Sequence, residues 1–386
     1  MTGTVAPEPA RRLEFLDSLR GLAALYVVGY HMVLMPDPDL RLPFWLERFV
    51  LNGGTGVTLF FVVSAFSLCY TMPARYREAR PLASFYLHRF MRIAPLFYLL
   101  IAVSWLRDAW LYGVWHGPWE VLGMLTFTFN LVPNAQQSFV WAGWTIGVEM
   151  LFYALFPLVV AYVRSVHAAV AFFFGTLLAW IAVGIVLAYL QLGQEAEASI
   201  LQWSALRYFP VFALGMATFH VFIRLDAAPA SPDRRDLGHA LVMAAIFLYA
   251  ALLQGWLPPV FGTLYYWQAV VYSCALLGLS VAPWRWVVNR ATRWLGEVSY
   301  SVYLWHPLVV IALVPAYTAI QSRIPNLTLG FFACVALTLL VLLPLSRLSY
   351  RWVEQPGIRL SRRLAQRWGW SRRDGQSSNA PASAAA

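Results

Sequence analysis

Long apolar runs dominate the pattern of hydrophobic and polar positions along the chain. A helix needs about 20 mostly apolar residues to cross a bilayer, and about ten stretches of this sequence meet that measure. Short segments rich in Arg, Gly and Pro separate these stretches. The pattern predicts an all-α integral membrane protein, a bundle of about ten transmembrane helices near residues 15–35, 56–72, 90–112, 144–163, 167–190, 205–223, 238–256, 262–282, 299–320 and 328–350.

Two stretches fall outside this pattern. Residues 119–133 are apolar but shorter than a span, and they end at Pro133, so we expect a re-entrant or interfacial piece. Residues 1–360 are expected to form a single membrane domain, because the expected spans take up most of this range and leave no stretch for a second folded unit. Residues 361–386 are first basic and then rich in Ala and Ser, which predicts a disordered tail.

Composition supports the membrane assignment and charge adds an orientation. The chain has 386 residues, of which 60% are hydrophobic and only 12% charged, about half the charged share of soluble domains. The net charge of +10 does not indicate a nucleic-acid partner, because the arginines lie between apolar runs rather than on a soluble basic face. They gather in alternate connections, which predicts that both termini are cytoplasmic, in a plasma (inner) membrane.

Two residue types limit the chemistry. All 28 basic residues are Arg, so a catalytic lysine or Schiff base is excluded. The cysteines at 69, 274 and 334 lie in apolar runs without CxxC or Cys/His spacing, so neither a disulfide framework nor a metal site is expected.

The first spanning stretch carries two ionisable side chains on one face. Arg20 and His31 are eleven residues apart, so they lie within about 20° of the same helix face and about 16 Å apart along its axis. A charged residue inside a bilayer costs about 2.5–3.5 kcal/mol on insertion scales unless it is paired or hydrated. The pair is either an interfacial arginine with a hydrogen-bonded packing histidine or part of a functional site.

Charged residues recur in the next polar stretches. Arg89 and Arg92 are one helical turn apart and could bind phosphate groups or anchor the helix at the interface. Glu149 stands in an otherwise apolar span beside Trp144. A buried carboxylate needs a cation or a proton, so Glu149 either pairs structurally with an arginine or histidine or takes part in acid–base chemistry.

A late stretch places three polar side chains on one helix face. Ser299, Tyr303 and His306 follow i, i+4, i+7 spacing, so they face protein or water rather than lipid. His306 directly precedes Pro307, and we expect it to be a substrate-pocket or structural residue rather than the base.

Taken in order, these stretches resemble the membrane acyltransferase family 3. Its members include O-acetyltransferases of lipopolysaccharide O-antigen, exopolysaccharide and peptidoglycan, and acylases of macrolides. The resemblance covers residues 12–358. LDSLRGLAALYVVGYH places the family's Arg and His on Arg20 and His31, and HRFMRIAPLFYL places its Arg-x-x-Arg on Arg89 and Arg92.

Further motifs continue the resemblance. WTIGVEMLFYALFP is similar to the family's Trp and Glu element, on Trp144 and Glu149, and LGEVSYSVYLWHPL to its late Ser-Tyr-His element. RWVEQP at 351–356 resembles the closing element. FFVVSAFSL resembles the second element, although Ala65 stands where the family usually has Gly.

The resemblance implies an O-acyltransferase that moves an acyl group, most simply acetyl, from acyl-CoA to a hydroxyl of a cell-envelope or exported glycan. Acyl transfer to an alcohol needs a base and anchoring for the donor's phosphates. We expect His31 to be the base, with Glu149 as a second catalytic candidate, while Arg20, Arg89 and Arg92 hold acetyl-CoA. The weaker candidates for the substrate pocket are Ser64, Trp144, Tyr303 and His306.

Three alternatives remain at this stage. A proton-coupled transporter also needs many spans with ionisable residues inside the membrane, but the sequence shows no internal repeat. A carrier that only passes the acyl group across the bilayer for a partner protein is a second alternative. An acyltransferase acting on a lipid or a secondary metabolite is the third.

Overall fold

The computed structural model describes residues 12–370, and within that range the chain forms helices joined by loops, with no β-strand. The all-α prediction is therefore confirmed. Four short helical segments, η1 to η4, interrupt or extend the longer ones at 53–55, 108–112, 129–131 and 350–354. The longer helices are α1 (Glu14–Leu34), α2 (Phe44–Leu51), α3 (Gly56–Arg75), α4 (Pro81–Arg107), α5 (Pro118–Leu125), α6 (Trp144–Tyr162), α7 (Val166–Leu190), α8 (Gln194–Trp203), α9 (Ala205–Ala227), α10 (Pro232–Leu253), α11 (Tyr265–Val281), α12 (Arg290–Ala312), α13 (Val314–Arg323), α14 (Leu327–Ser349) and α15 (Gln355–Arg367).

The predicted count of about ten spans is not confirmed. Within the described range, seven helical stretches are long and apolar enough to cross a membrane, or eight if α12 and α13, which meet at a 60° bend, form one span. Every expected span coincides with a helix, but α11 has only 17 residues. Helix α1 carries Glu14, Asp17 and Arg20 near its start, which lowers its apolar character. The protein is an integral membrane protein by this measure and by its composition.

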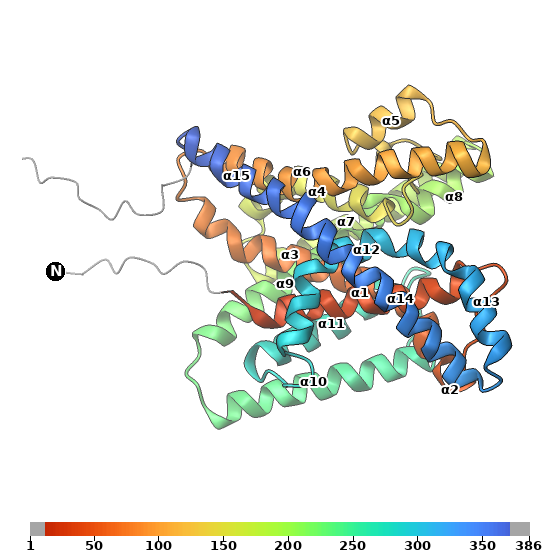
Figure 1. Cartoon of the computed structure of the whole chain (residues 1–386). Helices are drawn as coiled ribbons and strands as arrows, with labels where there is room; N and C mark the ends of the chain where they lie inside the picture. The colour runs from red at the N-terminus through yellow and green to blue at the C-terminus, as the bar shows by residue number, and fades with distance from the viewer. Residues whose placement is uncertain (1–11, 371–386) are drawn as a thin grey trace, which may run out of the picture.

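The described ends of the chain lie at the same end of the bundle. In Figure 1, α1 begins and α15 ends on the left, while α2, α5, α8 and α13 lie on the right. The Trp370 carbonyl accepts a hydrogen bond of 3.0 Å from the backbone N–H of Ala79, which joins the end of the described chain to the α3–α4 connection. That connection carries Arg77 and Arg80. The two ends of the described range and this basic connection are therefore on one side.

Helices α1 and α12 approach each other closely because glycines lie at their contact. A Cβ added to Gly296 would lie 2.0 Å from the Asp17 carbonyl oxygen, and one added to Gly21 would lie 2.7 Å from the Thr292 carbonyl oxygen. Backbones at this separation bring long side chains of the two helices into direct contact. The two histidines predicted on α1 and α12 are such side chains.

A second close contact joins α3 to α9. A Cβ on Gly215 would lie 2.6 Å from the Val62 carbonyl oxygen and 2.9 Å from the Cβ of Ala65. The family that the chain resembles usually has Gly at position 65. Ala65 fits here because Gly215 on the facing helix α9 leaves room for its Cβ.

Two segments differ from the sequence expectations in detail. The stretch 119–133 is not one continuous piece but the short helix α5 followed by the 3₁₀ turn η3. The basic part of the expected disordered tail is helical as far as Arg367, because small residues of α15 pack on the bundle while its arginines face outward: Gly357 and Ala365 are buried and Arg359 and Arg363 are exposed. Residues 371–386 of that tail lie outside the described range.

Candidate functional site

A polar cavity lies inside the bundle, where α1, α3, α4, α6 and α12 meet. Its wall combines aromatic side chains with charged ones, which is unusual within apolar helices. Six of the side chains predicted from the sequence line it: Arg20, Ser64, Arg89, Arg92, Glu149 and Tyr303. The fold thus brings together residues that are separated by up to 283 positions in the chain.

Helices α1 and α4 supply the three arginines. Arg20 donates a hydrogen bond of 2.7 Å from Nη2 to the Ser67 hydroxyl on α3, and its Nη1 lies 3.7 Å from Asp17. Arg89 and Arg92 follow one turn apart inside α4 and face the same cavity. The Arg89 guanidinium lies over the rings of Phe85 and Tyr153 at 5.9 and 5.4 Å.

Two of these arginines lack an acidic partner. No carboxylate lies within ion-pair distance of Arg89 or Arg92 among residues 12–370, and the Nε of Arg89 is buried without a hydrogen-bond partner. Three arginines and one glutamate line the cavity, which leaves a formal excess of two positive charges. An uncompensated positive charge in an apolar surrounding is costly, so the cavity is suited to an anionic ligand.

A second cavity continues from the first toward the end of the bundle where α1 begins. The two cavities share Arg20, Arg89 and Arg92. The second one is also lined by Arg12 and Asp17, at the start of the described chain. The arginines therefore stand between the membrane interior and the basic end of the molecule.

Glu149 is held by hydroxyl groups rather than by a cation. Its Oε1 accepts a hydrogen bond of 2.6 Å from the Ser64 hydroxyl and another from the Tyr153 hydroxyl, one turn along α6. Ser64 also lies 2.9 Å from the Tyr153 oxygen, so the three side chains form a closed triangle. The ion pair considered from the sequence is absent within the described range, where no arginine or histidine lies within ion-pair distance of Glu149.

This triangle predicts different effects for two substitutions of Glu149. In Glu149→Gln the amide oxygen still accepts both hydroxyl bonds, so we expect the thermal unfolding midpoint to stay close to that of the wild type and activity to fall less than about tenfold. Glu149→Ala leaves both hydroxyls without an acceptor and should cost about 1–3 kcal/mol of stability. Unfolding followed in detergent, with activity in parallel, measures both. A folded but inactive Gln variant would instead assign chemistry to the carboxylate.

His31 and His306 lie together, outside the lining of the arginine cavity. His306 is fully buried, its Nε2 is 3.0 Å from His31 Nδ1, and the two ring centroids are 4.8 Å apart. Tyr303 connects the two places, because it lines the cavity and its ring lies 5.6 Å from that of His306. Arg20 and His31 thus reach different neighbours, Ser67 on α3 and His306 on α12.

Two pocket candidates from the sequence do not line the cavity. Ser299 and Tyr303 of α12 line the cavity, whereas His306 of the same helix does not. Trp144, at the start of α6, packs at a tilt against aromatic residues instead, with its ring centroid 5.0 Å from that of Trp203 and 5.1 Å from that of Tyr208. The spacing along a helix identifies a face, but it does not show which part of that face meets a cavity.

Other polar residues near the site were not predicted. Tyr300 lines the cavity and donates a hydrogen bond of 2.9 Å to the Ile93 carbonyl of α4. Glu354, in η4, is 3% exposed and accepts a hydrogen bond from Ser301 on α12. The available signal for Glu354 was its place in RWVEQP, the stretch that resembles the closing element of the family.

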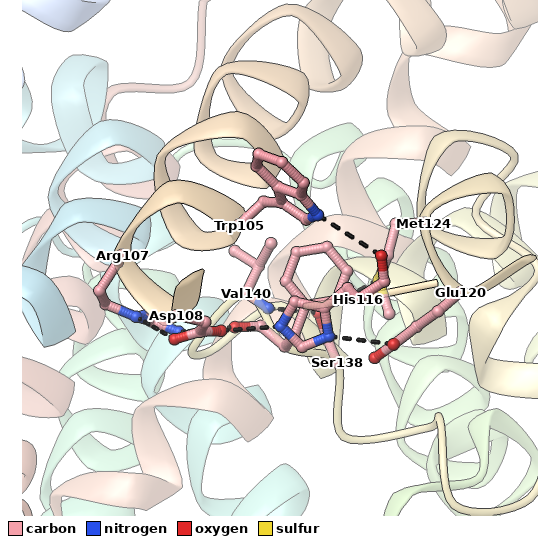
Figure 2. A network of polar contacts seen from close by, with 9 residues as sticks. Trp105, Arg107, Asp108, His116, Glu120, Met124, Ser138 and Val140 are labelled. Atoms are coloured by element: carbon pink, nitrogen blue, oxygen red, sulfur yellow. Dashed lines mark hydrogen bonds and ion pairs between the residues drawn. The ribbon is translucent and has the colours of Figure 1, made fainter. Parts of the chain in front are cut away.

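A second polar cluster (Figure 2) includes Glu120 of α5, which lies at the opposite end of the bundle in Figure 1. His116 stands between two carboxylates, with Nε2 2.9 Å from Asp108 and Nδ1 3.0 Å from Glu120. Arg107 contacts Asp108 at 2.7 Å and lies 3.8 Å from the ring centroid of Trp141. Both ring nitrogens of His116 therefore donate, which requires the charged imidazolium.

This cluster predicts how stability depends on pH. Burial by itself lowers the pKa of His116, but the hydrogen bonds to Asp108 and Glu120 outweigh it, and the pKa is raised. The pKa of His116 is thus higher in the folded protein than in the unfolded chain, where it is about 6.5. The stabilisation by the charged ring is therefore fully present below pH 6.5 and is lost as the pH rises through the pKa of the folded protein. The thermal midpoint of the wild type should fall over that interval and that of His116→Asn should change less. Equal slopes for both proteins would contradict this role.

No group of three or more side chains that could hold a metal ion lies within residues 12–370.

Comparison with known proteins gives one family and several distant relatives. A family model described as an acyltransferase domain matches residues 13–346. The peptidoglycan O-acetyltransferase OatA of Listeria monocytogenes is 21% identical over an alignment of 390 positions, gaps included, that covers 88% of this chain and 55% of the relative. The O-acetyltransferase OatA of Staphylococcus aureus is 23% identical over an alignment of 381 positions that covers 90% of this chain and 57% of the relative.

A third relative has the same extent of match. The putative peptidoglycan O-acetyltransferase YrhL of Bacillus subtilis is 24% identical over an alignment of 390 positions that covers 90% of this chain and 55% of the relative. The chain thus spans little more than half the length of these curated relatives. No solved structure gives a significant match.

Proposed function

The chain belongs to this acyltransferase family and is an acyltransferase, and on that premise we propose that it transfers an acetyl group from acetyl-CoA to a hydroxyl of a cell-envelope or exported glycan. We also propose that both termini lie in the cytoplasm and that the helix bundle lies in a bacterial plasma membrane. The excess of arginine at the end where the described chain begins and ends supports this orientation.

One observation carries the choice of donor: the cavity presents Arg89 and Arg92 without acidic partners. Coenzyme A carries several phosphate groups, and the planar guanidinium binds phosphate through two parallel hydrogen bonds. The second cavity extends the same arginines toward the basic end, from which a cytoplasmic donor would enter. Bound phosphates would supply the negative charge that the site lacks.

The histidine pair supplies the base for the transfer. His31 lies about 16 Å along α1 from Arg20, by the rise of a helix over eleven residues. An extended pantetheine arm held by its phosphates would carry the thioester across that distance, past Tyr303. His31 then takes the proton from the acceptor hydroxyl while the oxygen of that hydroxyl attacks the carbonyl carbon of the thioester. The carbon–sulfur bond breaks and coenzyme A leaves as a thiolate, which is then protonated.

The choice of a glycan as the acceptor rests on the names of the relatives. Two of them are named for peptidoglycan O-acetylation, at 21% and 24% identity over little more than half their length. A lipid or secondary-metabolite acceptor stays the alternative, because neither the cavity nor the family distinguishes among hydroxyls. Membership of the acyltransferase family favours an enzyme over the proton-coupled transporter.

Purified protein in nanodiscs, incubated with labelled acetyl-CoA and an oligomer of N-acetylglucosamine, tests the proposal. We expect acetylated product by mass spectrometry. Transfer from another acetyl donor but not from acetyl-CoA would overturn the donor assignment. Product that forms only after a second protein is added would instead support the carrier that passes the acyl group to a partner.

A further inference from the structure

We infer that His306 is a positioning residue for the base: its hydrogen bond fixes the tautomer of His31 so that Nε2 of His31 carries the free lone pair. The inference rests on the proposed function for its chemical meaning. Its geometric part stands on contacts between α1 and α12 alone. The sequence makes His306 a candidate for the substrate pocket; in the structure it is fully buried and contacts His31.

The proton on His306 is set by a backbone carbonyl. Nδ1 of His306 lies 2.5 Å from the Tyr303 carbonyl oxygen, which can only accept a hydrogen bond. Nδ1 of His306 is therefore protonated. In a neutral ring the other nitrogen, Nε2, then has a lone pair and can only accept.

That acceptor in turn sets the proton on His31. Nε2 of His306 lies 3.0 Å from Nδ1 of His31, so this nitrogen of His31 must donate. The Val27 carbonyl oxygen, one turn earlier on α1, lies 3.1 Å from the same Nδ1 and requires the same proton. Two independent acceptors thus hold the hydrogen of His31 on Nδ1, which leaves Nε2 unprotonated.

The free nitrogen remains accessible. Nε2 of His31 has no hydrogen-bond partner within residues 12–370, and it is not among the buried atoms that lack one. His31 itself is partly exposed, whereas His306 is 0% exposed. No carboxylate hydrogen-bonds to either ring within the described range, so the neutral form of the pair is the one the surroundings favour.

The arrangement explains why the two helices must approach so closely. Gly21 and Gly296 allow the backbones of α1 and α12 to touch, which puts the two imidazoles within hydrogen-bond distance. When His31 takes a proton on Nε2, its Nδ1–H still points at the lone pair of His306, which stabilises the charged ring. A fixed ring also keeps the base aimed in one direction, as a partner does for the histidine of a catalytic triad.

A direct test reads the tautomer without any substrate. The full chain, labelled with ¹⁵N-histidine in lipid, is examined by solid-state NMR, with assignments from single substitutions among its seven histidines. We expect an unprotonated Nε2 and a protonated Nδ1 for His31, and a loss of this preference in His306→Ala. A protonated Nε2 on His31 of the wild type would overturn the inference, whatever the protein acetylates.

Kinetics test the consequence with acetyl-CoA and an oligomer of N-acetylglucosamine. His306→Ala should lower kcat by about 10²-fold, the lower range for loss of a general base, with the KM for acetyl-CoA nearly unchanged. His306→Gln can still offer an amide oxygen to His31 Nδ1 and should recover at least part of kcat. The double variant His31→Ala/His306→Ala should be no slower than His31→Ala alone, because residues acting as a unit are not additive.

A matched control separates positioning from folding. His220 on α9 is also buried and bonds to a carbonyl, that of Val163 at 3.1 Å, far from the pair in sequence. His220→Asn should retain wild-type kcat. Wild-type kcat in His306→Ala, or losses that multiply in the double variant, would overturn the positioning role. A wild-type protein that keeps the expected tautomer but acetylates nothing would instead count against the proposed function.

Discussion

Replacing His31 by alanine is expected to abolish transfer, with kcat falling by about 10²–10⁴-fold, the range that general acid–base catalysis contributes. The reason is geometric. His31 is the ionisable side chain deep in α1 that keeps a free ring nitrogen, and it lies away from the arginines that would hold the donor. Steady-state kinetics on purified protein in nanodiscs measure the loss.

The substitution should leave donor binding almost unchanged, because His31 does not line the arginine cavities. Equilibrium binding of acetyl-CoA checks this point. His31→Asn is the matched variant, since its amide N–H can still donate to His306 or to the Val27 carbonyl but cannot serve as a base. Transfer at the wild-type rate by either variant would remove His31 from the chemistry.

The second large effect is expected from Arg89 and Arg92. A hydrogen bond to a charged group contributes about 1.5–3 kcal/mol, so loss of either guanidinium should raise the KM for acetyl-CoA by about 10- to 100-fold. In the proposed assignment the arginines bind the phosphates and not the reacting carbonyl, so kcat at saturating donor should change much less. Arg89→Gln and Arg92→Gln, each assayed over a range of acetyl-CoA concentrations, separate the two parameters.

The neighbouring connection offers a control of equal charge. Arg77 lies exposed in the α3–α4 connection, at the same end of the molecule but outside both cavities. Arg77→Gln changes the net charge by the same amount and should leave the KM for acetyl-CoA as in the wild type. An unchanged KM in Arg89→Gln and Arg92→Gln would refute the phosphate-binding assignment. An equal rise in all three variants would point to general electrostatic attraction of the donor.

The candidate site was predictable in part because an ionisable residue inside an apolar helix is costly unless it is paired or hydrated, so such residues stand out in the sequence. Arg20, Arg89, Arg92 and Glu149 are visible in the sequence as isolated charges in apolar runs, and all four line one cavity. Their partners are not visible in this way. Ser64 and Tyr153, which hold Glu149, are neutral residues whose contacts depend on how α3 meets α6.

The number of membrane spans illustrates a different limit. Apolar runs place every long helix, but hydropathy does not reveal that α12 and α13 meet at a bend of 60° or that α11 is only 17 residues long. In the tail, small residues of α15 at 357 and 365 find a packing surface on the bundle, which composition alone cannot show. Local sequence therefore predicts helices better than it predicts their ends.

By itself, the sequence determined that this protein is helical, embedded in a membrane and equipped with charges that an apolar surrounding tolerates only when they are paired or hydrated. Those properties follow from composition and periodicity, which act residue by residue. Only the tertiary structure decided that His306 contacts His31, and that Arg89 and Arg92 lack acidic partners within residues 12–370. These facts depend on which helices touch and how closely. Close approach is set by glycines such as Gly21 and Gly296, whose meaning appears only when the facing backbone is known.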